Sequence, residues 1–261
     1  MKFRKIISLV LVLCMVTMMP VFATKEPAFD YDVAYRWAID AGFPKEIIDT
    51  IDETFLEKIY YDNKDTENLE IEATVVQLYE TGNGVQRGNI SSSAMDFWIV
   101  GGKVSSAAGY IMNVNLYVHY EWNTWPTVGP DQDAITVTWD PEMWVFDSDS
   151  FEATFSDSLT DPYDEISRPA KATNGGIGWY CPMPSIPGTV PFGRAAFKLE
   201  PVDADLPTGN DNRTQFSAEY AHSRLDVSDI NLSFGDLGVT ISGSYDSAAD
   251  TLTLTYGDYA Q

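Results

Sequence analysis

An alternation of apolar and polar side chains over residues 110–122 constrains the fold of this chain more than any other feature. One set of alternate positions is apolar: Tyr110, Met112, Val114, Leu116, Val118, Tyr120 and Trp122. The positions between them are mostly polar: Asn113, Asn115, Tyr117, His119 and Glu121. A period of two residues is typical of an antiparallel strand with one buried face and one face in water. We therefore expect a long strand whose apolar set lies in the core.

The same period recurs toward the C-terminus. It is present in four further segments joined by stretches rich in Gly, Pro, Asp and Asn: 135–139, 193–199, 216–220 and 230–234. Residues 239–245 and 252–256 then indicate a terminal hairpin that turns at 246–250. Many strands with no helical pattern between them favour a sandwich over a parallel α/β fold. Residues 65–261 are therefore predicted to form a mainly β domain, an antiparallel β-sandwich of the immunoglobulin or jelly-roll type.

Residues 24–64 differ, because their apolar period is helical. Apolar side chains recur there at spacings of three and four: Tyr31, Ala34, Tyr35 and Ala38, then Ile47, Ile48, Ile51, Phe55 and Ile59. Gly42 followed by Pro44 is typical of one helix ending and another beginning. The stretch Thr50–Glu53 fits a capping box. We expect two short helices that pack on the β domain or on a partner, since so short a segment rarely builds its own core.

The first 23 residues have the pattern of an export signal. Lys2, Arg4 and Lys5 precede an apolar run, residues 6–19, that is shorter than the ~20 residues of a membrane span. A signal-peptidase site follows, ending at Ala23. Cys14 lies inside the apolar run, so lipidation is not expected. No later segment is apolar enough to cross a membrane, and we predict a secreted, extracellular protein of bacterial type with no membrane span once the signal is removed.

Acidic residues dominate the charge of the chain. It has 39 acidic and 16 basic residues, a formal net charge of −23 at pH 7. Such a field repels phosphate backbones and therefore excludes nucleic acid as a partner. It favours cations, especially calcium, and basic partners. The same acidity also serves simply to keep a secreted protein soluble.

Cys181 is the one cysteine left after the signal is removed, so an internal disulfide is excluded. Three roles stay open: a buried apolar side chain, a covalent link to another chain, or a nucleophile. Its neighbours Trp179, Tyr180 and Pro182 favour burial, which raises the pKa of a thiol and keeps it unreactive.

The two histidines of the chain are His119 and His222, each two residues after a tyrosine. If they met across strands near a carboxylate, they would provide ligands for zinc. The alternation favours a different arrangement, with a solvated His119 and a packed His222.

Aromatic residues gather between positions 117 and 144. Trp122 and Trp139 have the parity of core residues, whereas Trp125 and Trp144 are expected in or near loops. Aromatic rings on such loops stack on sugars, so we take Trp125, Trp144, Tyr117 and His119 as candidate ligand-binding residues. Packing in the core is the alternative for most of them.

Two kinds of acidic site are possible. Asp140, Glu142 and Asp147 lie among tryptophans, an environment in which paired carboxylates carry out glycoside hydrolysis. Short Asp-rich loops also supply the oxygens that calcium prefers. The candidate calcium ligands are Asp147, Asp149, Asp203 and Asp205, and ordinary turn chemistry is their alternative.

Three functions follow from these residues. The first is a secreted, acidic, non-enzymatic β-sandwich that binds an extracellular glycan or protein. The second is a carbohydrate-active hydrolase that uses carboxylates in the segment 139–147. The third is a structural component of an extracellular matrix or coat.

Overall fold

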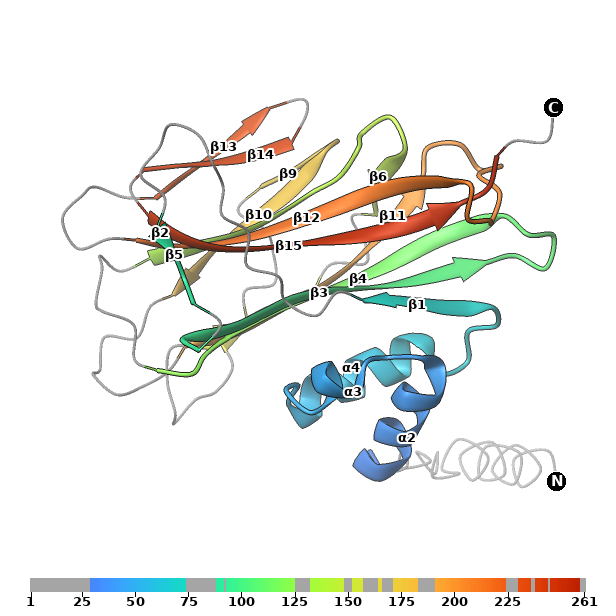
Figure 1. Ribbon diagram of the computed structural model, residues 1–261, viewed down its shortest axis with the longest axis horizontal. Helices are drawn as coiled ribbons and strands as arrows, with labels where there is room; N and C mark the ends of the chain where they lie inside the picture. Colours follow the sequence, from blue (N-terminus) through green and yellow to red (C-terminus); the bar gives the residue numbers. More distant parts are fainter. Residues whose placement is uncertain are drawn as a thin grey trace, which may run out of the picture. The chain divides into compact units, whose positions relative to one another are not determined.

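Figure 1 shows the computed structural model of the chain. The structure describes residues 29–73, 88–91, 93–124, 132–147, 152–156, 164–165, 171–182, 191–223, 230–235, 238–243 and 245–258. The chain divides into two compact units, Met1–Tyr31 and Asp32–Gln261, and the features below belong to the second. The export signal predicted for residues 1–23 lies outside the described residues.

Among the described residues before the strands, three helices are present where two were expected: α2 (Tyr31–Ala41), α3 (Lys45–Ile48) and α4 (Glu53–Asn63). Helix α2 is followed by Gly42, whose φ of 101° is a left-handed conformation that glycine adopts at little cost. The predicted break between Gly42 and Pro44 is therefore present.

The start of α4 differs from the predicted capping box. Asp52 is the N-cap, because its carboxylate accepts hydrogen bonds from the backbone N–H groups of Thr54 (2.9 Å) and Phe55 (3.1 Å). Thr50, the cap expected from the sequence, instead donates its hydroxyl to the carbonyl oxygen of Ile47 at 2.8 Å. The helix consequently begins two residues later than predicted.

The first sheet, sheet A, has seven strands in the order β1-β3-β4-β11-β7-β8, with β6 also paired to β11. These strands are β1 (Leu69–Ala73), β3 (Met95–Ser105), β4 (Ile111–Trp122), β6 (Trp144–Phe146), β7 (Glu152–Ser156), β8 (Asp164–Glu165) and β11 (Phe192–Pro201). All of its pairs are antiparallel.

The second sheet, sheet B, has six strands in the order β2-β15-β12-β5-β10-β9. They are β2 (Gly88–Asn89), β5 (Gln132–Thr138), β9 (Lys171–Thr173), β10 (Gly176–Pro182), β12 (Asn212–Ser223) and β15 (Tyr245–Tyr256). The short β2 runs parallel to β15, and the other pairs are antiparallel. A separate hairpin joins β13 (Asn231–Gly235) and β14 (Gly238–Ser242).

The main core lies between the two sheets. It combines side chains of sheet A, such as Phe97 and Val118, with side chains of sheet B, such as Val137, Phe216 and Leu252. Burial of these apolar surfaces is the main stabilising term of such a fold. The prediction of a mainly β, antiparallel sandwich with short N-terminal helices is therefore confirmed.

The other face of sheet A is covered by the helices (Figure 1). Phe55 of α4 stacks on Trp98 of β3 with ring centroids 6.2 Å apart, and it meets the ring of Tyr117 edge-on at 6.1 Å. Asn63 donates its side-chain N–H to the Tyr117 hydroxyl at 2.6 Å. The helical segment thus packs on the β domain, one of the two arrangements that we expected.

This helical layer overturns one expectation about β4. Tyr117 and His119 were predicted on a face in water, but each is only 1% exposed. Alternation marks two faces of a strand and does not reveal that a third layer covers the more polar one.

The first residues of β4 also differ from the prediction. The register between β3 and β4 shifts between Val104 and Ser105, which marks a β-bulge or irregularity. Such a shift reverses the inward and outward positions beyond it. Ile111 is buried, whereas Tyr110 and Met112 are exposed, so their predicted place in the core is wrong. From Val114 onward the predicted phase holds.

The predicted terminal hairpin is wrong. Strand β15 runs unbroken through the expected turn and pairs with β12, while β14 pairs with β13. The buried Asp250 explains why an acidic stretch remains extended, because its carboxylate accepts the backbone N–H groups of Ile99 (3.3 Å) and Thr251 (2.8 Å).

Within the part of the chain that the structure describes, no helix is long and apolar enough to cross a membrane.

Candidate functional site

Two of the predicted ligand-binding residues lie beneath the helices. The His119 ring stacks on Trp98 with centroids 5.0 Å apart, and its Nε2 lies 3.7 Å from a carboxylate oxygen of Glu121. Tyr117 accepts the hydrogen bond from Asn63, and burial raises the pKa of its hydroxyl. Neither ring presents a face to solvent, so their contacts here are those of a packed interface.

Trp125 and Trp144 were predicted to offer exposed rings for stacking, and among the described residues no such exposed ring is present at these positions. Trp144 lies in β6 rather than in a loop, is fully buried, and donates its indole N–H to the hydroxyl of Thr214 at 3.3 Å. It packs on Phe216 in the main core. Trp125 lies outside the described residues. Trp122 and Trp139 are buried, as their parity predicted.

The histidines do not meet. His119 faces the helices from sheet A, while His222 lies in β12 and contacts Trp122 of the main core, with centroids 5.1 Å apart. The Nδ1 atom of His222 is 3.0 Å from a carboxylate oxygen of the buried Asp133. The Tyr220 hydroxyl also donates to Asp133, at a short distance. The packing predicted for His222 is present, and the zinc pair is not formed.

Cys181 lies next to the polar set formed by Asp133, His222 and Tyr220, since it pairs in register with Asp133 in sheet B. Its side chain is fully buried, and burial raises the pKa of the thiol well above its ordinary value. A protonated, inaccessible thiol is a poor nucleophile. The predicted burial of Cys181 is confirmed.

The predicted calcium ligands occupy separate positions. Asp147 follows β6 and forms an ion pair with Lys198 at 2.6 Å. Asp203 and Asp205 share an exposed turn, in which the Asp203 carboxylate accepts the Asp205 N–H at 3.1 Å, and Asp149 lies outside the described residues. Among the side chains that the structure describes, no group of three or more potential metal ligands is formed. Calcium binding stays a prediction.

A different surface feature lies where β4 begins and β11 ends, beside β6. In the described part of the sandwich, the exposed large apolar side chains are Tyr110 (39%), Met112 (52%), Val145 (44%) and Val202 (56%). We name these four residues the apolar corner. Single exposed apolar residues are common on proteins, but a group of them is typical of an interaction surface.

Strands β6 and β11 place one half of the corner. Val145 pairs with Glu200, and its neighbour Trp144 points into the core, so Val145 points outward. Val202 follows two residues after Glu200 on the same side. Its N–H donates to the carbonyl oxygen of Met143 at 2.8 Å, which joins the end of β11 to the turn before β6.

The start of β4 places the other half. The N–H of Ile111 donates to the carbonyl oxygen of Leu206 at 2.8 Å, and Tyr110 forms a β-bridge with Pro207. Met112 therefore lies beside the turn that follows Val202. These backbone contacts hold all four side chains on one fixed frame.

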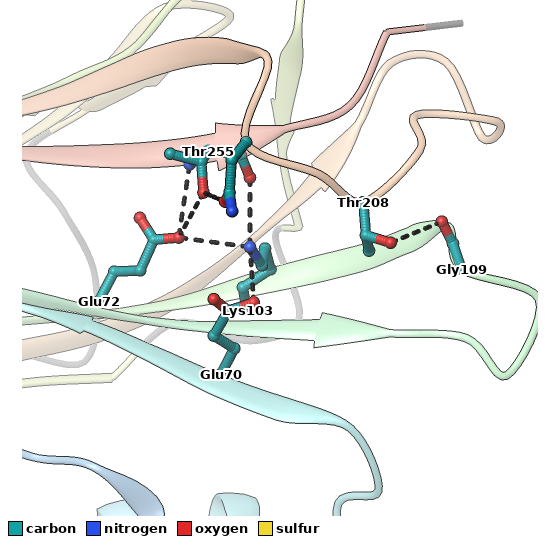
Figure 2. Close-up of polar contacts among 7 residues, drawn as sticks. Glu70, Glu72, Lys103, Gly109, Thr208 and Thr255 are labelled. Atoms are coloured by element: carbon teal, nitrogen blue, oxygen red, sulfur yellow. Dashed lines mark hydrogen bonds and ion pairs between the residues drawn. The ribbon is translucent and has the colours of Figure 1, made fainter. Parts of the chain in front are cut away.

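Figure 2 shows how the same end of the sandwich is tied together. The Thr208 hydroxyl donates to the carbonyl oxygen of Gly109 at 3.0 Å. Nearby, the buried Lys103 ammonium lies 2.8 Å from Glu70 and 3.3 Å from Glu72, and it donates to the carbonyl oxygen of Thr255 at 3.2 Å. Lys103 thereby links β1, β3 and β15, which supports the frame behind the corner.

Exposed carboxylates lie beside Val145 and Val202 of the apolar corner. Asp140 and Glu142 lie on the turn before β6, where the Asp140 carboxylate accepts the Glu142 N–H at 2.9 Å. Glu200 lies between the two valines, and Asp203 and Asp205 lie on the turn after Val202. We name these five residues the acidic rim. From the sequence, Asp140 and Glu142 were predicted to serve hydrolysis, and Asp203 and Asp205 to bind calcium, whereas the apolar surface beside these four turn residues was not predicted.

Comparisons with known proteins give likenesses of fold only. No protein-family model matches the chain, and no curated protein matches it. Among solved structures, the collagen-binding subdomain of the Enterococcus faecalis surface protein ACE is similar at 12% identity and a TM-score of 0.32, over 58% of this chain and 94% of that one. A collagen-binding domain from a Staphylococcus aureus adhesin is similar at 7% identity and a TM-score of 0.30, over 53% and 87%.

An enzyme is similar to the same degree. AvmM, which catalyses macrocyclization in alchivemycin A biosynthesis, is 16% identical with a TM-score of 0.29, over 71% of this chain and 98% of that one. Likenesses at this level carry no statement about function.

Proposed function

We propose that this protein acts outside the cell as a non-catalytic binding protein, and that the apolar corner contacts a protein partner. The gathering of four exposed large apolar side chains on one fixed frame carries this proposal. Protein interfaces have an apolar centre and a polar rim, and the corner with its acidic rim has the same arrangement. A rigid frame also lowers the entropic cost of binding.

A protein partner fits the corner better than a glycan. Tyr110 is its one aromatic residue, whereas sugar sites built on stacking use broad, exposed aromatic faces. Met112 and the two valines provide flexible and aliphatic contacts of the kind that fill pockets between proteins.

The double variant Met112→Ser/Val202→Ser is expected to weaken partner binding at least about tenfold, since it removes apolar contacts worth more than about 1.4 kcal/mol. The matched control is Val33→Ser/Ile39→Ser, which changes two exposed apolar residues of α2. The probes are immobilised collagen, hen lysozyme, serum albumin, xylan and peptidoglycan, with binding measured by biolayer interferometry.

Saturable binding to at least one protein, weakened in the corner variant and unchanged in the control, supports the proposal. Binding to a glycan alone contradicts it, as does equal binding by all three proteins. Release of reducing sugar that is lost in Asp140→Asn/Glu142→Gln would instead establish the hydrolase.

A further inference from the structure

We infer that the apolar corner takes a segment of a basic protein, in which an apolar or aromatic side chain is flanked by lysines or arginines. This inference rests on the proposed function and adds the chemistry of the partner. The observation that carries it is the position of the acidic rim beside the exposed side chains of Val145 and Val202.

The two acidic turns meet at Val202. The N–H of Val202 donates a hydrogen bond to the carbonyl oxygen of Met143, which joins Val202 to the turn with Asp140 and Glu142. Asp203 follows Val202 directly in the chain. An apolar side chain of a partner that contacts Val202 therefore brings its flanking residues over carboxylates. Cations at those flanks meet opposite charge, while acidic flanks meet like charge.

Lys198, a basic residue of β11 near this surface, contributes little free positive charge. The Lys198 ammonium lies 2.6 Å from Asp147 and 3.5 Å from Glu200, so its charge is shared between two acids. Among the described residues named here, the charge around Val202 is therefore negative.

The whole-chain charge distinguishes a basic partner from a second copy of this chain. At a net charge of −23, two copies repel each other, and joining two acidic rims would add like charges at close range. A basic partner gains from both the local and the long-range field. Exposed ion pairs are each worth less than about 1 kcal/mol, so the rim sets the choice of partner and the rate of encounter, while the apolar contacts set most of the affinity.

The test uses a synthetic peptide with one tryptophan between two runs of four lysines. Comparison peptides replace the tryptophan with serine, or the lysines with glutamates. Binding to the full chain is measured by isothermal titration calorimetry at about 20 mM and about 200 mM salt, because screening separates charge from apolar contact.

The rim variant Glu142→Gln/Glu200→Gln/Asp205→Asn is expected to bind the lysine–tryptophan peptide about tenfold more weakly than wild type at low salt. The control Asp32→Asn/Asp40→Asn/Glu46→Gln removes the same charge from exposed positions of α2 and α3, and is expected to stay within about twofold. The serine peptide is expected to bind at least about tenfold more weakly than the tryptophan peptide.

Equal weakening in the rim and control variants would overturn the inference, because the attraction would then be that of any polyanion. Absence of binding, or tighter binding of the glutamate peptide, would also overturn it. In each of these cases the proposed function still stands if Met112→Ser/Val202→Ser loses its protein partner in the panel above.

Discussion

Raising the pH from about 9 to about 11 is expected to lower the free energy of unfolding by roughly 7 kcal/mol, about the whole stability of a typical domain. Four fully buried groups carry this effect, since burial raises the pKa of each: Cys181, Tyr117, Tyr120 and Tyr220. In the unfolded chain they ionise near pH 8.5 for cysteine and near pH 10 for tyrosine.

The sign of the effect follows from which state keeps the proton. The native state holds protons that the unfolded chain releases, so the stabilising contribution is complete below the unfolded pKa values and is lost as the pH rises above them. Each group removes about 1.4 kcal/mol per pH unit once its unfolded form is ionised. Urea unfolding at a series of pH values measures this slope.

The variant Tyr120→Phe is expected to reduce the slope above about pH 10 by about 1.4 kcal/mol per pH unit, because one of the four protons is then absent. The control Tyr61→Phe removes a hydroxyl from a ring that is 45% exposed, so it reports the effect of losing a tyrosine hydroxyl outside the core. If the free energy of unfolding stayed constant from about pH 9 to about pH 11, the raised pKa values of the four buried groups would be contradicted.

The variant Asp52→Ala is expected to destabilise the protein by about 3 kcal/mol. Its carboxylate both caps α4 and forms a short ion pair with Arg194 of sheet A, whose side chain is only 6% exposed. The lost cap costs about 1 kcal/mol. The guanidinium left without its carboxylate costs about 2 kcal/mol more.

Asp52→Asn separates the two effects, because asparagine is also a good N-cap but carries no charge. It is expected to cost about 2 kcal/mol. Lys45→Ala removes a solvent-exposed i,i+4 ion pair with Asp49, and it is expected to cost much less than either Asp52 variant. Chemical denaturation with a single transition measures all three. Wild-type stability for Asp52→Asn would show that the ion pair does not fasten the helices to the sheet.

The strands were predictable because their side chains alternate and their connections carry turn residues. Val114–Trp122 shows this most clearly, since its apolar set lies in the core as expected. The burial of Cys181 followed in the same way from its apolar neighbours. Such patterns are local, and local patterns are what a sequence displays directly.

Contacts between distant segments could not be predicted. The residues near Tyr117 and His119 in the sequence do not predict that α4, more than fifty residues earlier, covers these two side chains. The sequence likewise did not predict the contacts of Asn63, whose side chain forms hydrogen bonds with Tyr117 and Asn115.

The apolar corner was missed because of a single backbone irregularity. Alternation assigned Tyr110 and Met112 to the core, and the register shift at Val104 and Ser105 turns them outward instead. A β-bulge has no strong sequence signal here, so its effect on the surface became visible only in three dimensions.

Methionine methyl signals test the central claim most directly. With carbon-13 in the methionine methyl groups, the nuclear magnetic resonance spectrum of the full chain is recorded while the lysine–tryptophan peptide, or a protein found in the panel, is added. Met112 of the corner and Met143, whose carbonyl oxygen accepts the Val202 N–H, are expected to shift with saturation, while the buried Met95 keeps its position. Saturation that moves neither Met112 nor Met143 would show that the partner binds elsewhere, and the apolar corner would then not be the binding surface.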